Sequence, residues 1–153
     1  MSRFDLDNFL PYQLAVLSQR VSEGFARHYR ERFGINVAEW RVVAHLSQED
    51  AVSVREICRR VNMDKPKVSR AASRLEAAGF VRKEENPADR RLVKLSLTGA
   101  GRAMVDELAP IAQSYEEELA ALMGEDDFSR FRGLVGRLNT GLAARAPGKG
   151  GGA

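Results

Sequence analysis

The sequence has few of the residues from which metal sites, disulfides and membrane spans are built. Its 153 residues include one cysteine, Cys58, and two histidines, His28 and His45. One cysteine cannot form an internal disulfide, and these three residues cannot make a structural zinc site without several carboxylates. No apolar run approaches the roughly 20 residues that cross a bilayer, and the first residues lack the apolar stretch of a secretory signal. We expect a cytoplasmic protein with no membrane contact, no metal and no cofactor.

Recognisable catalytic motifs are also missing. The chain has no HExxH, no CxxC pair, no GxSxG and no phosphate-binding GxxxxGK[ST]. Gly99 and Gly101 have the spacing of two glycines in a dinucleotide-binding loop, but the third glycine and the βαβ context are absent. We therefore expect no catalytic residue and no enzyme activity.

Basic residues are concentrated in the middle of the chain. The whole sequence has 24 lysines and arginines, 21 acidic residues and a formal net charge of +3. Residues 53–98 hold twelve basic and six acidic residues, a net charge of +6, which leaves −3 on the remainder. A basic centre between acidic flanks is typical of a nucleic-acid-binding module on a more neutral scaffold. A solvated, arginine-rich face would have the same composition.

Three long segments have apolar residues at every third or fourth position, which predicts helices over residues 7–33, 99–123 and 126–145. Gly34 is expected to end the first helix and Thr98 to cap the second, in which Pro110 predicts a kink or a local break. These helices are too apolar on one side to be left in water, and their spacing fits a dimer interface or a monomeric bundle. Residues 147–153, rich in glycine, are predicted to form a flexible tail. The apolar side of the third helix is expected to be buried: Phe128, Phe131, Leu134, Val135, Leu138 and Leu142.

The middle of the chain predicts three shorter helices and a hairpin. One helix is expected over residues 37–46, and Ser53 and Asp64 stand where the N-caps of two further helices belong. Residues 80–85 and 92–97 are predicted to pair as strands, joined by a polar loop over residues 86–91. A helix, a short turn, a basic helix and a hairpin are together typical of a winged helix-turn-helix. The helix after Asp64 is expected to turn four residues inward: Val68, Ala71, Ala72 and Leu75.

The hairpin carries a family resemblance. Its second strand reads Asp89-Arg90-Arg91-Leu92-Val93-Lys94-Leu95-Ser96-Leu97-Thr98 and resembles the wing signature of the MarR family of bacterial transcriptional regulators. That signature is Asp, any residue, Arg, five residues and Leu-Thr, often with a glycine three residues later, which is Gly101 here. The resemblance covers about residues 7–144. It implies a mostly α protein with a small β-hairpin, in which residues 37–98 form the winged helix-turn-helix and residues 7–33 and 99–146 form dimerisation helices.

The resemblance also implies a homodimer that binds palindromic operator DNA and releases it when a small molecule binds. An arginine at a hairpin tip suits the narrow, negative minor groove, and the family pattern puts the fixed arginine at Arg91. An exposed salt bridge between Asp89 and Arg91 is the alternative interpretation. The residues expected to contact double-stranded DNA are Lys65, Lys67, Ser69, Arg70, Ser73 and Arg74 on the basic helix, and Asp89, Arg90 and Arg91 on the wing.

In the family the effector site usually lies between the dimerisation helices and the winged helix. The residues placed for it here are Tyr12, Arg20, Trp40, Arg41 and His45. An arginine beside an aromatic ring suits an aromatic carboxylate or a phenol, and a CoA thioester is a further possibility. Trp40 also fits a core position, and His45 an ordinary helix face. Cys58 stands at an inward position, which favours an inert small hydrophobe over a redox sensor.

The patterns and the resemblance together predict a DNA-binding transcriptional regulator that responds to a small molecule. The resemblance implies a repressor that occludes a promoter, and activation stays open. Two alternatives stay open. One is a DNA-binding protein without an effector. The other is a helical interaction module whose basic centre meets an acidic partner protein.

Overall fold

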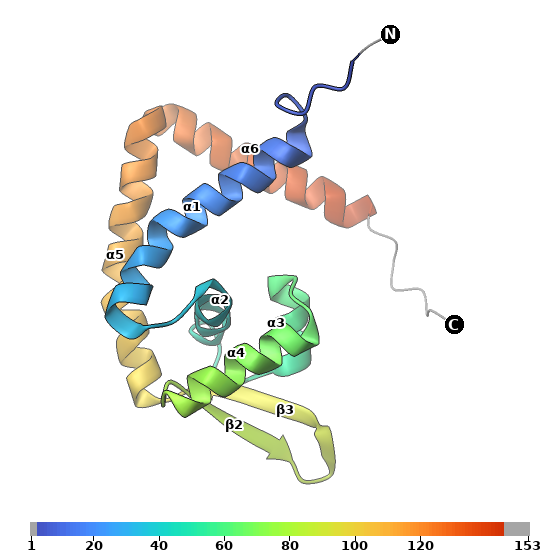
Figure 1. Cartoon of the computed structure of the whole chain (residues 1–153), viewed down its shortest axis with the longest axis vertical. Helices are drawn as coiled ribbons and strands as arrows, with labels where there is room; N and C mark the ends of the chain where they lie inside the picture. The colour runs from blue at the N-terminus through green and yellow to red at the C-terminus, as the bar shows by residue number, and fades with distance from the viewer. Residues whose placement is uncertain (1–2, 146–153) are drawn as a thin grey trace. The chain divides into compact units, whose positions relative to one another are not determined.

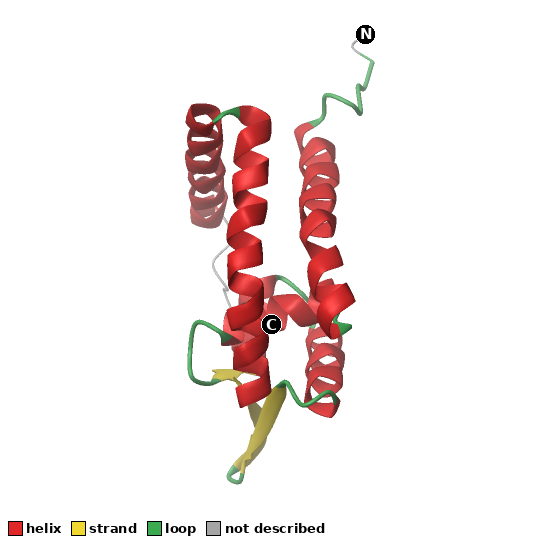
Figure 2. Ribbon diagram, turned by 90° about the vertical axis from the view of Figure 1, so that its left-hand side faces the viewer, coloured by secondary structure: helices red, strands yellow, loops and turns green. Residues whose placement is uncertain are grey.

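The computed structural model describes residues 3–145, apart from the side chains of Arg90 and Arg91. The chain forms two compact units, of which the first ends at Ala112 and the second begins at Gln113. The fold is mostly helical with one small sheet, as predicted (Figure 2). The predicted tail over residues 147–153 lies outside the described residues, as does residue 146. The elements are α1 (Leu10–Phe33), α2 (Val37–Leu46), β1 (Val52–Ser53), α3 (Val54–Val61), α4 (Lys65–Ala77), β2 (Val81–Asn86), β3 (Asp89–Leu97), α5 (Gly99–Met123) and α6 (Glu125–Arg145) (Figure 1).

The first helix begins later than expected and ends where expected. α1 starts at Leu10 rather than at residue 7, because the N–H of Phe9 bonds to the carbonyl of Leu6 at 3.1 Å and closes a turn there. A proline in the first turn of α1 costs no helical hydrogen bond, since the first amides of a helix have no partner within it. Gly34 ends the helix in the left-handed conformation, with φ of 67°.

Both predicted caps of the helix-turn-helix are confirmed. The side chain of Ser53 accepts a hydrogen bond from the N–H of Glu56 at 3.1 Å and starts α3. The carboxylate of Asp64 accepts from the N–H of Lys67 at 2.8 Å and starts α4. Between the two helices Asn62 adopts the left-handed conformation, which asparagine tolerates better than most residues. Local side-chain chemistry therefore defines both helix starts.

The sheet is larger than predicted by one short strand. Its order is β1-β3-β2, with antiparallel pairs throughout, and Val52 and Ser53 of β1 pair with Leu95 and Lys94. Two residues are too few to show the alternation of apolar and polar side chains that predicts a strand, so β1 was not expected. The predicted loop over residues 86–91 is wrong, because β3 already begins at Asp89 and leaves only residues 87–88 in the turn. The extra residues of β3 lie in the exposed part of the hairpin. Strands there have no buried apolar side, so the sequence has no alternating pattern that would predict them.

The core of the first unit joins the winged helix to the end of α1 and the start of α5. All four residues that were predicted to face inward from α4 are buried. Leu95 of β3, Ile57 of α3 and Met104 of α5 are buried in the same apolar cluster. Tyr29 of α1 stacks on Trp40 of α2, with ring centres 5.5 Å apart. The winged helix is therefore supported by both neighbouring helices rather than standing alone.

One expectation about the long helices is wrong, and another is answered in part. α5 runs from Gly99 to Met123 through Pro110, so the predicted local break does not occur, and the alternative, a kink, stays a prediction. Pro110 is exposed, so the carbonyl that loses its helical partner there is free to bond water. The apolar side of α6 is not buried in this chain: Leu134, Leu138 and Leu142 are 50%, 44% and 57% exposed. Only Phe128 and Phe131 of that side are partly buried.

None of the helices within residues 3–145 is long and apolar enough to span a membrane.

Candidate nucleic-acid interface

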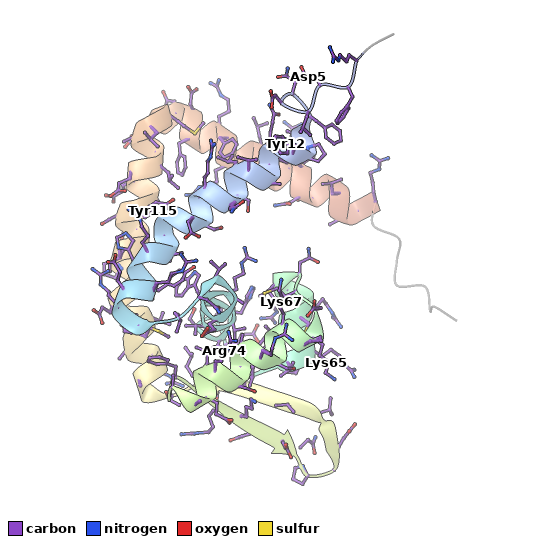
Figure 3. All side chains as sticks on the ribbon, viewed as in Figure 1. Asp5, Tyr12, Lys65, Lys67, Arg74 and Tyr115 are labelled. Carbon is purple, nitrogen blue, oxygen red and sulfur yellow. The ribbon has the colours of Figure 1, made fainter. Side chains whose placement is uncertain are left out.

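The packing of α4 determines which of its side chains reach solvent. Its apolar side faces α2 and α3, and in Figure 1 α4 lies in front of α2, which is viewed nearly along its axis. The opposite side carries the residues that were predicted to contact DNA. Ser69 is partly buried, and the other five are exposed: Lys65, Lys67, Arg70, Ser73 and Arg74. Figure 3 shows Lys65, Lys67 and Arg74 along this side of the helix.

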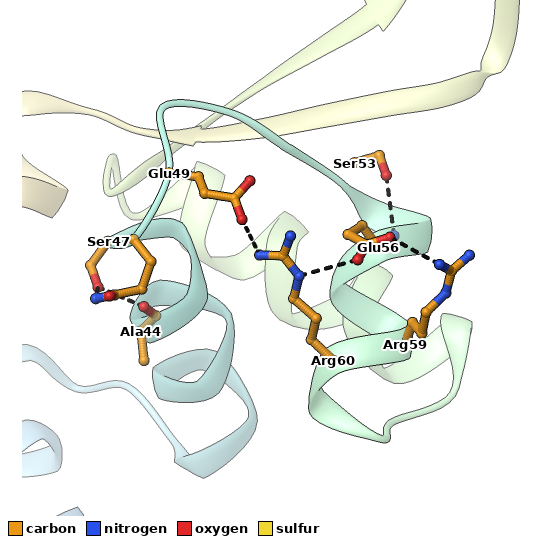
Figure 4. A network of polar contacts seen from close by, with 8 residues as sticks. Ala44, Ser47, Glu49, Ser53, Glu56, Arg59 and Arg60 are labelled. Atoms are coloured by element: carbon orange, nitrogen blue, oxygen red, sulfur yellow. Dashed lines mark hydrogen bonds and ion pairs between the residues drawn. The ribbon is translucent and has the colours of Figure 1, made fainter. Parts of the chain in front are cut away.

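Two of the three arginines of α3, Arg59 and Arg60, are paired with acids. Arg60 pairs with Glu49 of the loop after α2, and its Nε donates to Glu56 at 3.2 Å (Figure 4). Arg59 lies 3.5 Å from the second oxygen of Glu56. The hydrogen bond from Arg60 to Glu49 raises the pKa of the arginine. The pair with Glu49 joins α3 to the loop that precedes it, so Arg60 serves the fold.

The basic side chains of α4 are not neutralised in this way. Lys65, Lys67, Arg70 and Arg74 make no ion pair with any residue in the described part of the chain. Lys67, Arg70 and Arg74 share one exposed side of α4 and Lys65 lies at its start; these cations repel one another, and a negatively charged partner removes that repulsion. The face is therefore suited to an anionic surface of similar length.

A lysine of the wing holds α4 against the sheet. The Nζ of Lys83 on β2 donates to the hydroxyl of Ser73 at 2.8 Å and lies 3.9 Å from the carboxylate of Glu76. Both partners are on α4, so the strand and the helix are joined near the last turns of α4. In the sequence, Lys83 is only one of the twelve basic residues between residues 53 and 98. Nothing in the spacing of residues 73 and 83 signals this contact.

The start of α5 ties the wing to the end of α4. The N–H of Thr98 bonds to the carbonyl of Phe80 at 3.0 Å, and its hydroxyl donates to the carbonyl of Gly79 at 2.6 Å. The same hydroxyl accepts from the N–H of Gly101 at 3.1 Å, which confirms Thr98 as the cap of α5. A Cβ at residue 101 would collide with the carbonyl oxygen of Phe80. The Leu-Thr-x-x-Gly part of the wing signature thus forms the packed junction between the end of α4, the wing and the start of α5.

The wing tip is the two-residue turn at Pro87 and Ala88. The N–H of Ala88 bonds to the side chain of Asn86 at 2.9 Å. Arg90 and Arg91 belong to β3 beside this turn, and their side chains lie outside the described part. Asp89 is partly buried at the start of the strand. The roles expected of these three residues stay predictions.

A family model described as the MarR family matches residues 33–92. PapX, an HTH-type transcriptional regulator of Escherichia coli, is 26% identical over 128 residues, which are 82% of this chain and 78% of PapX. The crystal structure of SPO1453, a MarR family transcriptional regulator from Silicibacter pomeroyi DSS-3, has a TM-score of 0.78 at 29% identity and covers 92% of this chain and 99% of that one. The family model, the curated regulators and the solved structures all support a MarR family transcriptional regulator.

This MarR-family chain is a DNA-binding transcriptional regulator with the winged-helix fold of its relatives. A structure of BpsR from Bordetella bronchiseptica, whose DNA binding is regulated by 6-hydroxynicotinic acid, matches with a TM-score of 0.77 at 22% identity. The match covers 90% of this chain and 98% of the BpsR chain, and it shows a shared fold.

The residues expected to bind an effector do not line one cavity in the MarR-family chain. Tyr12 and Arg20 line a hollow of about 340 Å³ along α1. Arg41 lines another, of about 450 Å³, beside the first turn of α4. Trp40 packs between the rings of Phe25 and Tyr29, so it is part of the aromatic core. His45 is partly buried on α2.

Cys58 is only partly buried, where the sequence indicated an inward position. It packs against the core and also lines a hollow of about 510 Å³ between α3, α4 and the wing. Lys65, Ser69 and Lys83 line the same hollow, which we call the wing-side hollow. No group of three or more His, Cys, Asp or Glu side chains that could hold a metal occurs among the residues described.

Proposed function

We propose that the protein is a homodimeric repressor that binds palindromic operator DNA through α4 and the wing and releases it when a small molecule binds. One observation carries the DNA-binding surface. The four cations of α4 are exposed and make no ion pair with any described residue, whereas Arg59 and Arg60 of neighbouring α3 are paired. A solvated structural face would need no such difference between two adjacent helices.

The dimer is supported by apolar side chains that this chain leaves in water. On α6, Leu134, Leu138 and Leu142 share one helical side and are each more than two-fifths exposed. At the start of α1, Leu10, Leu14 and Leu17 are exposed in the same periodic way. Contiguous apolar surface of this kind marks an interaction site in soluble proteins. A second copy covers both stripes and places two α4 helices about one turn of DNA apart.

The effector class rests on the chemistry of the α1 hollow. Tyr12 offers an aromatic ring and Arg20 a guanidinium, which together suit an aromatic carboxylate; a phenol or a CoA thioester remain candidates. The ligand of BpsR is an aromatic carboxylate, which agrees with this choice. An effector that binds better to a dimer with mis-spaced α4 helices shifts the population away from DNA. Occupation of a promoter by the DNA-bound dimer represses transcription.

Fluorescence anisotropy tests the DNA-binding half of this proposal. The expected result is tight binding to the gene's own upstream duplex, with two protomers per site, and weak, salt-sensitive binding to a scrambled duplex. Arg91→Ala weakens operator binding while the melting temperature stays nearly unchanged. Arg130→Ala, which removes an exposed cation from α6, serves as the control. Equal and weak binding of both duplexes by the native protein contradicts the proposal.

The effector half is tested on the protein–operator complex. Addition of 6-hydroxynicotinate, as a representative aromatic carboxylate, is expected to release the duplex and to raise the melting temperature of the free protein. Arg20→Ala is expected to abolish both effects without weakening operator binding. Release that is equally efficient with Arg20→Ala contradicts the placement of the effector in the α1 hollow.

A further inference from the structure

A second hollow flanks the first turn of α4, and none of its described lining residues belongs to the wing. It has a volume of about 450 Å³ and lies where the end of α1, the start of α2 and the turn between α3 and α4 meet. Its charged lining residues are Arg30, Arg41, Asp64 and Lys67. Lys65, two residues from Lys67, lines the wing-side hollow instead. The start of α4 therefore has a hollow on each side, and each contains one of its lysines.

Two of the cations in this second hollow are unneutralised. Arg30 is paired with Glu23, and the carboxylate of Asp64 accepts the N–H of Lys67 as the cap of α4. Arg41 and Lys67 are exposed and make no ion pair within the described part of the chain. The carboxylate of Asp64 lines the same hollow but forms no ion pair with either side chain, so three cations face one carboxylate there. A guanidinium and an ammonium in such a cationic hollow are suited to a tetrahedral oxyanion.

The start of α2 adds donors to the same place. Asn36 caps this ten-residue helix, and its side chain accepts from the N–H of Glu39 at 2.8 Å. Val37 and Ala38 come next, and both line the hollow. The first amides of a helix have no acceptor within it, and the helix dipole makes this end positive. Arg41, one turn further along α2, supplies the full charge that the helix end alone lacks.

We propose that this hollow binds a phosphate group of the operator backbone, held by Arg41 and Lys67 together with the first amides of α2. The inference rests on the proposed DNA-binding function and adds Arg41 and α2 to the interface. A helix in the major groove has sugar-phosphate backbone along its flanks, so a cationic hollow beside its first turn meets phosphate rather than base edges. The contact carries no sequence information, and it determines the register of α4 in the groove.

The proposal reassigns Arg41, which the sequence had suggested as an effector residue. A carboxylate effector would offer the same anionic oxygens, so the two sources need separate tests. DNA is favoured over a carboxylate effector because Lys67 lines the hollow and also lies on the exposed side of α4 that carries Arg70 and Arg74.

A salt series on the full-length protein tests the phosphate contact. Anisotropy gives the affinity of native protein, Arg41→Ala and Lys67→Ala for the operator and for a scrambled duplex, at several salt concentrations. Each variant is expected to lose about tenfold or more in affinity for both duplexes. The slope of log affinity against log salt should fall by about 0.9 for each phosphate released, hence by about 1.8 for a dimer. Arg41→Lys should keep most of the slope, since it keeps the charge.

The control is Arg32→Ala, which removes an exposed cation from the last turn of α1 and does not touch the hollow. Its affinity and slope should match those of the native protein, and circular dichroism confirms that every variant is folded. Arg41→Gln replaces Arg41→Ala if the alanine variant does not fold.

Three outcomes overturn the proposal. If Arg41→Ala leaves affinity and slope unchanged while Arg74→Ala weakens operator binding, the phosphate site is wrong and the proposed function stands. If a variant loses affinity for the operator but not for the scrambled duplex, the substituted residue contacts a base rather than a phosphate. If Arg41→Ala binds DNA as the native protein does but no longer shows the rise in melting temperature with 6-hydroxynicotinate, the hollow is an effector site. Failure of the native protein to bind either duplex, by contrast, refutes the proposed function itself.

Discussion

Leucines in the core of the first unit and leucines of α6 follow the same helical spacing and have opposite environments. Leu46, Leu75 and Leu108 are at most 2% exposed, whereas Leu138 and Leu142 are 44% and 57% exposed. Burying apolar area stabilises a folded protein by roughly 25 cal/mol per Å². The buried leucines therefore contribute to the stability of a single chain, and the exposed leucines of α6 contribute little to it. Periodicity shows which residues share a side of a helix. It does not show what covers that side.

α1 contains both environments in a single helix. Ala26 and Tyr29 near its end are buried in the core of the first unit. Leu10 and Leu14 near its start are 51% and 38% exposed. One apolar stripe thus passes from an intramolecular core to a surface that we propose a second copy covers.

Leu75→Ala should lower the free energy of unfolding by about 2–5 kcal/mol, because it leaves a cavity in a packed core. Urea denaturation measures the loss. Leu122→Ala is the matched control, since Leu122 is 84% exposed and its truncation should change stability by less than about 0.5 kcal/mol. A loss of less than about 1 kcal/mol for Leu75→Ala would contradict the assignment of this residue to the core.

Leu138→Asp should convert the proposed dimer to single protomers, because it puts a charge into the apolar stripe of α6 that we propose a second copy covers. Light scattering measures the mass. Asn139→Asp adds the same charge to the neighbouring exposed residue and should keep the dimer. An unchanged dimer mass for Leu138→Asp would remove α6 from the interface.

Gly101→Ala should destabilise the protein by about 1–3 kcal/mol, because the added Cβ collides with the carbonyl oxygen of Phe80 and the junction must shift. Gly99→Ala, two residues earlier, is the control, since a Cβ there meets no atom within 4 Å. Thermal denaturation compares the two variants. Equal melting temperatures would show that the start of α5 moves away at little cost.

Glu23→Gln should have the smallest effect, confined to acid. The hydrogen bond from Arg30 lowers the pKa of Glu23 below its ordinary value of 4.5. Such a carboxylate adds stability above its unfolded-state pKa, and this stability is lost as the pH falls through the folded-state pKa. The variant should therefore lose slightly less melting temperature than the native protein between about pH 6 and about pH 3. Identical curves would show that the pair contributes nothing.

Much of the interface could be predicted because its determinants are local. Ser53, Asp64 and Thr98 each accept a hydrogen bond from an N–H three residues later, and such caps are readable from neighbouring residues. The buried side of α4 follows from the helical period, and with it the exposed side that carries the basic residues. The sequence by itself thus determined the helix starts, the wing signature and which residues of α4 share a face.

Tertiary structure decided which charges are available and which apolar sides are covered. Arg60 and Lys67 look alike in the sequence, but Glu49, eleven residues before Arg60, neutralises only the first. Lys83 reaches Ser73, and Gly101 packs on Phe80, only because the chain folds back between them. Arg41 and Lys67 line one hollow for the same reason. Interactions between residues far apart in the chain depend on the packing of whole elements, which no local pattern encodes.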